Sequence, residues 1–161
     1  MSKSLKRIKS ALSAAGTQIP VIETGAATTA LAAAKTLGCH IDQIAKSIIF
    51  EGSKSLKLYL FVTAGSKRVS LERAALLTGE PTLKAGPENI RRITGFAIGG
   101  VSIVGHLSPI TTFFDAYLML FPIIYAAAGT PYHVFGCMPQ LMQSLCRGKL
   151  SHYLKRIKYI I

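Results

Sequence analysis

A glycine-rich stretch is the part of this chain best suited to chemistry. Residues 94–115 read TGFAIGGVSIVGHLSPITTFFD, with four glycines among apolar and β-branched residues. Glycine in such a context marks a bulge, a bend or the close approach of a ligand to the backbone. The pair Gly99-Gly100 could present bare N–H groups to an oxyanion or a phosphate. A tight hairpin turn without any ligand is the interpretation that spacing alone favours.

Lys46, in the segment IAKSIIF, is the second candidate. If residues 45–51 form a strand, Lys46 shares one face with Ile48 and Phe50 because side chains alternate with a period of two. Its ammonium would then be a point charge at an apolar wall, suited to a phosphate or a carbonyl oxygen. A lysine at a strand start with its head in solvent is the alternative.

His106 and Asp115 are further candidates, each with a structural alternative. His106 follows Gly105 and could be a general base or a group that holds the loop by a hydrogen bond. Asp115 follows an apolar segment and could orient a pocket group, balance Lys46 or cap the next turn. The chain has no Ser-His-Asp order and no cysteine beside a plausible base, so catalysis by a side-chain nucleophile is unsupported.

The order and spacing of these segments resemble the YbaK/prolyl-tRNA-synthetase-associated domain family. The resemblance runs over residues 5–145 and is most specific in the lysine segment and in TGFAIGGV, with FFDAYL and YAAAGTPYHV as weaker support. Members of this family are trans-editing aminoacyl-tRNA deacylases, such as Cys-tRNA(Pro) and Ala-tRNA(Pro) deacylases, which hydrolyse amino acids wrongly attached to tRNA. The resemblance implies a hydrolase without cofactor or metal. Its expected partners are the aminoacylated 3′ end of tRNA and an aminoacyl-tRNA synthetase.

The resemblance also implies roles for particular residues. Lys46 matches the family's essential lysine, which holds the 3′ end of the tRNA. The family's GxxxP loop, whose backbone surrounds the aminoacyl ester, matches Gly99, Gly100, Val101, Ser102 and Ile103. Together with Lys46 we expect the two glycines to be catalytic, and the rest of the loop, His106 and Asp115 to bind substrate. Water would attack the ester while backbone N–H groups stabilise the oxyanion and a tRNA hydroxyl assists.

One position departs from the family pattern, because Ile103 stands where the family has proline. Proline fixes φ and removes an N–H donor, and isoleucine does neither. Either packing holds the loop instead, or the shape of the pocket and the choice of substrate differ.

Length and composition limit the other possibilities. A chain of 161 residues fits one domain with a real core. The net charge of +12 favours a polyanionic partner. Mean hydropathy is +0.39, but the longest apolar stretch, residues 116–129, is too short to span a bilayer, so we expect no stable membrane insertion. The three cysteines show no disulfide or zinc spacing and indicate free thiols in a reducing cytoplasm.

The pattern of elements predicts an α+β single domain. We expect helices at residues 4–15, 28–37, 70–77, 87–94 and 139–147. We expect strands at residues 18–23, 45–51, 57–63, 111–114, 123–127 and 132–135, with glycine-rich strands after residue 94. Irregular interleaving with hairpin connections, and the family resemblance, indicate a strongly twisted mixed sheet, largely antiparallel, that curls toward a barrel with helices around it.

Both ends of the chain are basic. In the first helix Lys6, Arg7 and Lys9 lie off the apolar face, where they would dock tRNA phosphates or face solvent. We place the editing domain at residues 1–148 and a basic amphipathic extension at residues 149–161. The extension is predicted to be a helix that folds back on the core, with a tail that binds RNA or a membrane surface as the alternative.

The favoured hypothesis is a trans-editing hydrolase that removes a small amino acid from mischarged tRNA, with tRNA(Pro) as the expected substrate. A catalytically silent homologue that binds tRNA or a synthetase is the first alternative, motivated by Ile103. A peripheral membrane protein that uses its basic ends is the second.

Overall fold

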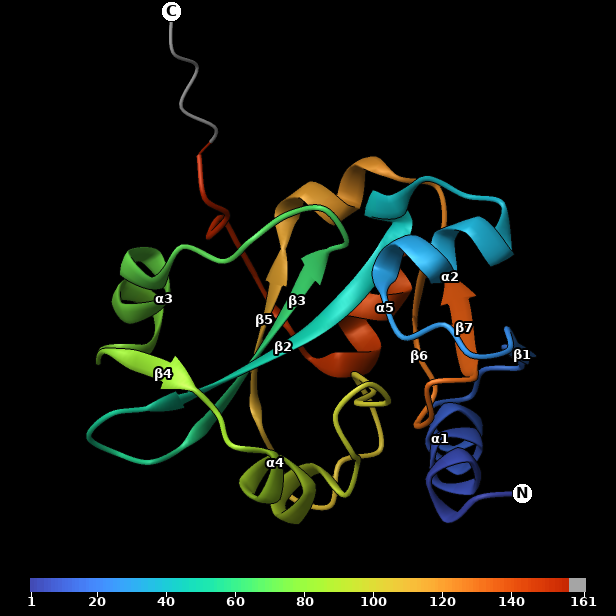
Figure 1. The fold of residues 1–161 in the computed structure, drawn as a ribbon, viewed down its shortest axis with the longest axis horizontal. Helices are drawn as coiled ribbons and strands as arrows, with labels where there is room; N and C mark the ends of the chain where they lie inside the picture. Colours follow the sequence, from blue (N-terminus) through green and yellow to red (C-terminus); the bar gives the residue numbers. More distant parts are fainter. Residues whose placement is uncertain (157–161) are drawn as a thin grey trace, which may run out of the picture.

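The computed structural model describes residues 1–156 of the chain (Figure 1). Its helices are α1 (Lys3–Ala14), α2 (Ala30–Leu37), α3 (Leu71–Thr78), α4 (Pro87–Thr94) and α5 (Pro139–Cys146), with 3-10 turns η1 (Ile41–Gln43) and η2 (Ala116–Leu120). Its strands are β1 (Val21–Glu23), β2 (Ile44–Gly52), β3 (Leu58–Ala64), β4 (Thr82–Lys84), β5 (Thr111–Asp115), β6 (Ile124–Ala127), β7 (His133–Cys137) and β8 (Lys149–Ser151).

The strands form one mixed sheet in the order β1-β7-β6-β2-β3-β5-β8, with β4 paired to β2 off this path. The pairs β1–β7, β6–β7, β2–β3 and β2–β4 are antiparallel, whereas β2–β6, β3–β5 and β5–β8 are parallel. The predicted α+β class with a mixed sheet is confirmed. The sheet is not closed into a barrel, because its path ends at β1 and β8.

Strand β2 has a gap along one of its edges. On one side it pairs with β3 from residue 45 to residue 51. On the other side it pairs with β6 at residues 44–45 and with β4 at residues 50–52. Residues 46–49 therefore have no strand partner on that side within the described chain, and Ala85 N–H donates a single hydrogen bond of 3.3 Å to the Ile49 oxygen. This gap lies directly beside Lys46.

The main core lies between the sheet and the helices that cover it. Ile8 and Leu12 of α1 enter it, and Leu5 on the same apolar face of the helix is also buried. The three cysteines are free thiols, and burial raises the pKa of Cys137 and of Cys146 to about 11. Among residues 1–156 there is no helix with both the length and the apolar character that crossing a bilayer requires.

The predicted glycine-rich strands do not form. Residues 96–110 are an irregular loop between α4 and β5, which is called the glycine loop below. Gly95, Gly99 and Gly105 adopt φ values of +79°, +92° and +75°, which lie in the left-handed half of conformational space rather than the β region. Three residues with positive φ within eleven residues are incompatible with a continuous strand.

The predicted C-terminal helix is also wrong for the residues that the structure describes. Residues 149–151 form β8, which pairs with β5, and Leu154 makes an isolated bridge to Val69. Ser151 and Tyr153 are buried while Leu150 and His152 are exposed. This alternation has the period of a strand, not of a helix. The remainder of the predicted helix, residues 157–161, lies outside the described residues.

Candidate active site

An apolar cavity of about 490 Å³ occupies the gap beside β2. Residues 44–50 form its floor, and α2, β6 and the turn after β6 contribute walls. Further walls come from the segment between β4 and α4 and from Ile98, Gly99 and Val101 in the glycine loop. The volume falls within the range of about 300–1,000 Å³ that is usual for small-molecule sites.

Small side chains dominate the wall of this alanine-lined cavity. Its seven alanines are Ala27, Ala30, Ala33, Ala45, Ala85, Ala126 and Ala127. Its polar and charged side chains are Thr24, Thr28, Thr29, Lys46, Ser47, Lys84, Thr130 and His133, with the phenol of Tyr125. Alanine methyl groups give shape but no directional bonds, so the few polar groups must orient a ligand.

Ser47 is the polar group in this wall that most needs an explanation. Its Oγ is buried and has no hydrogen-bond partner within residues 1–156. A buried hydroxyl left without a partner costs about 1–3 kcal/mol. Ala45 and Ile49, two residues away on either side, face the main core, so Ser47 lies on that side of β2 and Lys46 on the other. Ser47 is one of the residues that line the cavity, while its Oγ is itself covered by neighbouring atoms.

The amine of Lys46 is anchored to the backbone. Its Nζ donates a hydrogen bond of 2.7 Å to the backbone oxygen of Lys67. An ammonium has three N–H donors, and the other two have no partner within the described residues. Burial lowers the pKa of Lys46, Arg68 lowers it further, and Asp42 opposes both effects. The group is therefore held in place while it keeps donors for a ligand.

Lys46 borders two hollows. One is the alanine-lined cavity, and the other is a polar hollow of about 370 Å³ on the face that Lys46 shares with Ile48 and Phe50. This agrees with the predicted placement of the three side chains on one face of a strand. A charge between an apolar cavity and a polar hollow could contact two chemically different parts of one ligand.

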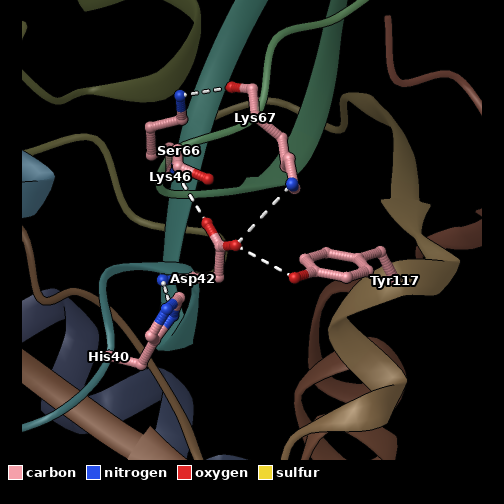
Figure 2. A network of polar contacts seen from close by, with 6 residues as sticks. All are labelled: His40, Asp42, Lys46, Ser66, Lys67 and Tyr117. Atoms are coloured by element: carbon pink, nitrogen blue, oxygen red, sulfur yellow. Dashed lines mark hydrogen bonds and ion pairs between the residues drawn. The ribbon is translucent and has the colours of Figure 1, made fainter. Parts of the chain in front are cut away.

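Asp42 fixes the turn that holds Lys46 (Figure 2). Its carboxylate accepts hydrogen bonds from Ser66 N–H at 2.8 Å and Tyr117 Oη–H at 3.0 Å, and the Lys67 ammonium lies 4.0 Å away. Burial alone would raise the pKa of Asp42, but these hydrogen bonds and the Lys67 charge lower it overall. An ionised Asp42 thus positions the carbonyl that accepts from Lys46.

Gly99 and Gly100 serve different purposes in the loop. Gly99 has its positive φ and open space where a side chain would be, and its N–H has no acceptor within residues 1–156. At Gly100 a Cβ would lie 2.8 Å from Thr130 Cα and 2.9 Å from the Gly129 oxygen. The Gly100 N–H donates to the Ala97 oxygen at 3.1 Å. Gly99 therefore offers a bare amide, and Gly100 lets the loop pack closely on the turn after β6.

The next three residues lead from the cavity into the core. Val101 lines the cavity. Ser102 is fully buried and Ile103 is 1% exposed, and Ile103 packs in the main core rather than in the cavity wall. Packing thus holds the loop at the position where the family has proline, which is the first of the two alternatives given above.

His106 stabilises the glycine loop by contacts on the buried side of the loop. Its Nε2–H donates to the Ser102 oxygen at 2.7 Å, and its ring packs edge-on against Phe96 at 6.1 Å between centroids. Burial lowers the pKa of His106, the bond to Ser102 opposes this, and the charge of Arg7 lowers the pKa further. His106 does not line the alanine-lined cavity.

Arg7 of α1 stabilises the same loop by hydrogen bonds to its backbone. Its Nε donates to the Gly105 oxygen at 2.6 Å, and a terminal nitrogen donates to the Gly95 oxygen at 2.9 Å. Its guanidinium also lies over the Phe96 ring, 4.4 Å from the centroid. Arg7 thus joins both ends of the loop to α1 and does not simply face solvent, while the docking of tRNA phosphates by this helix stays a prediction.

Asp115 begins η2. One carboxylate oxygen accepts from Tyr117 N–H at 2.9 Å, and Oδ2 is buried without a hydrogen-bond partner within the described chain. Burial raises the pKa of Asp115. Asp115 lines neither hollow, and its observed contact is the turn cap that was the structural alternative to a pocket role.

The structure brings Lys46, Gly99 and Val101 together around the alanine-lined cavity. The other predicted site residues lie behind the loop or away from the cavity: Gly100, Ser102, Ile103, His106 and Asp115. Sequence reasoning missed Ser47 and Asp42 as site residues. Ser47 could have been noticed as a hydroxyl on the opposite face of the strand from Lys46. Asp42 could have been noticed because acidic residues are rare in this basic chain.

The chain resembles known proteins in sequence and in fold. Its sequence matches the aminoacyl-tRNA editing domain over residues 24–145. The uncharacterized protein YwhH of Bacillus subtilis (strain 168) is 30% identical over 108 residues, which cover 67% of this chain and 68% of that protein.

Two solved structures superpose on nearly the whole chain. A proposed trans-editing enzyme for prolyl tRNA synthetase has a TM-score of 0.91 and 37% identity, covering 97% of this chain and 99% of that one. A scaffold protein from computational epitope grafting has a TM-score of 0.91 and 34% identity, covering 97% and 100%.

The matched region contains the lysine strand, the cavity beside it and the glycine loop. Sequence and fold therefore lead to the same assignment as the resemblance to YbaK-like proteins. The chain belongs to the aminoacyl-tRNA editing domain family.

Proposed function

We propose that this protein is a trans-editing hydrolase that removes a small amino acid from mischarged tRNA, with tRNA(Pro) as the carrier. The observation that supports the proposal is the alanine-lined cavity, whose lining includes both Lys46, with its anchored amine, and Gly99, with its bare amide. The net charge of +12 supports a polyanionic substrate.

In this proposal the aminoacyl ester lies along the exposed edge of β2. The Gly99 N–H faces the ester carbonyl and stabilises the oxyanion that forms when water attacks. Lys46 holds the terminal nucleotide with its two remaining N–H donors, and the Ser47 side chain turns toward the cavity to bond the amino acid or the attacking water. Catalysis then depends on positioning and on a tRNA hydroxyl, without a covalent enzyme intermediate.

Ser102, Ile103 and His106 act through the shape of the loop in this proposal, because their contacts lie behind it. Gly100 acts the same way through its close packing on residues 129–130. Asp115 caps the turn that carries Tyr117, which in turn donates to Asp42.

Incubation with Ala-, Cys- and Ser-charged tRNA(Pro) tests the reaction and its substrate. We expect ester loss with at least one of these, at a rate that falls at least 100-fold in Lys46→Ala with an unchanged melting temperature. Lys54→Ala is the matched control, because Lys54 is an exposed lysine on the β2–β3 hairpin, away from the cavity lining. Full activity in Lys46→Ala would remove the role assigned to this lysine.

The same assay separates the proposal from a catalytically silent homologue. Salt-dependent binding of every charged tRNA without ester loss by the wild-type protein would establish the silent alternative. Ser47→Ala refines the test, since removing its hydroxyl should slow hydrolysis about tenfold while the fold is unaffected or slightly more stable.

A further inference from the structure

The polar hollow on the far face of β2 is lined by cations. Its lining residues are Lys46, Ile48, Phe50, Gly65, Ser66, Lys67, Arg68, Val69 and Lys155. Four of these nine carry a positive charge and none carries a negative one. Ile48 and Phe50 provide an apolar floor, so the charged groups surround the floor on a concave surface.

The C-terminal segment is fixed in place as part of this hollow. Lys155 N–H donates to the Arg68 oxygen at 2.8 Å, and Ser70 N–H donates to the Tyr153 oxygen at 2.8 Å. Tyr153 is fully buried, and its hydroxyl donates to the Val62 oxygen at 2.6 Å. Lys155 therefore stands beside Arg68 because the backbone pairing and a buried tyrosine hold it there.

The charges in the hollow are largely uncompensated. Among residues 1–156 the one ion pair is that of Lys67 with Asp42, at 4.0 Å. Lys46, Arg68 and Lys155 have no carboxylate at ion-pair distance in the described chain, and the proximity of Arg68 lowers the pKa of Lys46. Like charges held together are costly unless an anion joins them.

Phosphate is the anion that this arrangement fits best. Arginine binds phosphate oxygens bidentately, and lysines serve as point charges around the same group. Figure 2 shows the Lys46 amine held by the turn of residues 66–67, which Asp42 in turn anchors, so this part of the hollow is fixed before a ligand binds.

We propose that this hollow is a phosphate subsite that takes the RNA backbone directly preceding the aminoacylated nucleotide, and that residues 152–156 are a working part of it. The assignment rests on the proposed function, because Lys46 borders both this hollow and the alanine-lined cavity. The ester would occupy the cavity and the preceding phosphates the hollow, with Lys46 between them. The basic C-terminal segment then binds RNA rather than a membrane.

Binding of uncharged tRNA tests the subsite without any chemistry. The double variant Arg68→Ala/Lys155→Ala should bind at least tenfold more weakly, and the slope of log affinity against log salt should become shallower by about 2. The control Lys54→Ala/Lys57→Ala removes the same charge from the exposed β2–β3 hairpin and should change affinity less than threefold. Equal losses in the two double variants would overturn the proposal.

A substrate without phosphates separates the subsite from the active site. Hydrolysis of 3′-O-alanyl-adenosine should be the same in the wild type and in Arg68→Ala/Lys155→Ala, whereas kcat/KM on charged tRNA should fall at least tenfold in the variant. Equal losses on both substrates would place these residues in the chemistry and overturn the subsite. If the wild type hydrolyses neither substrate, the proposed function fails while the binding experiment still decides the subsite.

Titration with inorganic phosphate distinguishes a site for the RNA backbone from a site for free phosphate. Titration monitored by amide NMR shifts should perturb residues 65–69, and tRNA should displace the ion. Perturbation of these residues by phosphate that tRNA does not displace would indicate a site for the free ion and overturn the RNA assignment.

Discussion

At the scale of single residues, Lys46 shows how one side chain can be both fixed and available. Its hydrogen bond to the Lys67 oxygen uses one donor, and burial together with Arg68 lowers its pKa. An anionic ligand would reverse part of that shift, because an opposite charge favours the ammonium form. The anchored lysine is therefore prepared for an anion before the anion arrives.

The two adjacent glycines should respond differently to alanine. Gly99→Ala forces a side chain to φ +92° in open space, which costs about 1–2 kcal/mol and places a methyl group beside the cavity. Gly100→Ala meets the backbone of Thr130 at 2.8 Å, and overpacking of this kind costs about 1–3 kcal/mol.

Thermal melting and kcat/KM on charged tRNA would check both variants. We expect each to lose at least tenfold in activity, with the stability loss in Gly100→Ala tracing to the displaced turn after β6. A Gly100→Ala protein as stable as the wild type would contradict the close contact.

His106 predicts a pH dependence of stability. Because burial lowers its folded-state pKa below the ordinary value of 6.5, the unfolded chain binds the proton first as the pH falls. The stabilisation is therefore complete above about pH 6.5 and is lost as the pH drops toward the folded-state pKa. His106→Gln keeps a donor for the Ser102 oxygen but cannot titrate.

Calorimetry at pH 7.5 and pH 5 would show this effect. Between pH 7.5 and pH 5 the melting temperature of the wild type should fall further than that of His106→Gln. In a domain of this size, each kcal/mol of lost stability lowers the melting temperature by about 2–4 °C. Identical losses in the two proteins would mean that the imidazole does not carry the dependence.

Lys46 and the glycine loop could be found from residue types, because charge and missing side chains are visible in the sequence. Ser47 and Asp42 could not be ranked in the same way, since serine and aspartate have many structural uses. Their importance follows from burial and from partners on distant segments, such as Tyr117 for Asp42.

At the scale of elements, α1 and the glycine loop form one unit. The guanidinium of Arg7 reaches the two carbonyl oxygens at the ends of the loop, of Gly95 and Gly105, and covers Phe96. A planar fork can serve two acceptors in this way, whereas an ammonium is a single point charge.

Arg7→Lys should therefore loosen the loop without unfolding the domain. We expect a loss of about 1.5–3 kcal/mol, the range for hydrogen bonds to charged groups, and a fall in kcat/KM of at least fivefold. Lys9→Ala on the same helix is the control for lost charge, since Lys9 is exposed. Activity equal to the wild type in Arg7→Lys would show that the loop keeps its shape without the fork.

Most elements were predictable because their end signals are local. Ser70 caps the start of α3, Gly79 ends it, and Pro87 starts α4, close to the predicted ranges 70–77 and 87–94. Helix α2 begins at Ala30 with Thr29 as its N-cap, two residues after the start predicted for it at residue 28. The loop after residue 95 and strand β8 depend on distant partners, so periodicity alone assigned them wrongly.

At the scale of the whole molecule, the excess of cations should govern encounter with tRNA. If four phosphates are contacted, affinity for tRNA should fall by about 50- to 150-fold between 50 and 200 mM salt. Fluorescence anisotropy at several salt concentrations measures this slope. A fall of less than fivefold would show that the net charge of +12 serves solubility rather than binding.

The unpaired edge of β2 affects how substrates could be sorted. Strands β6 and β4 pair with this edge of β2 at the two ends of the gap. To widen the gap for a larger amino acid, hydrogen bonds between β2 and these strands would have to break. Substrates would then be selected by the fixed width of this gap, without a loop that closes over them. A preference for larger amino acids would then have to come from changes to the residues that line the cavity, above all its alanines.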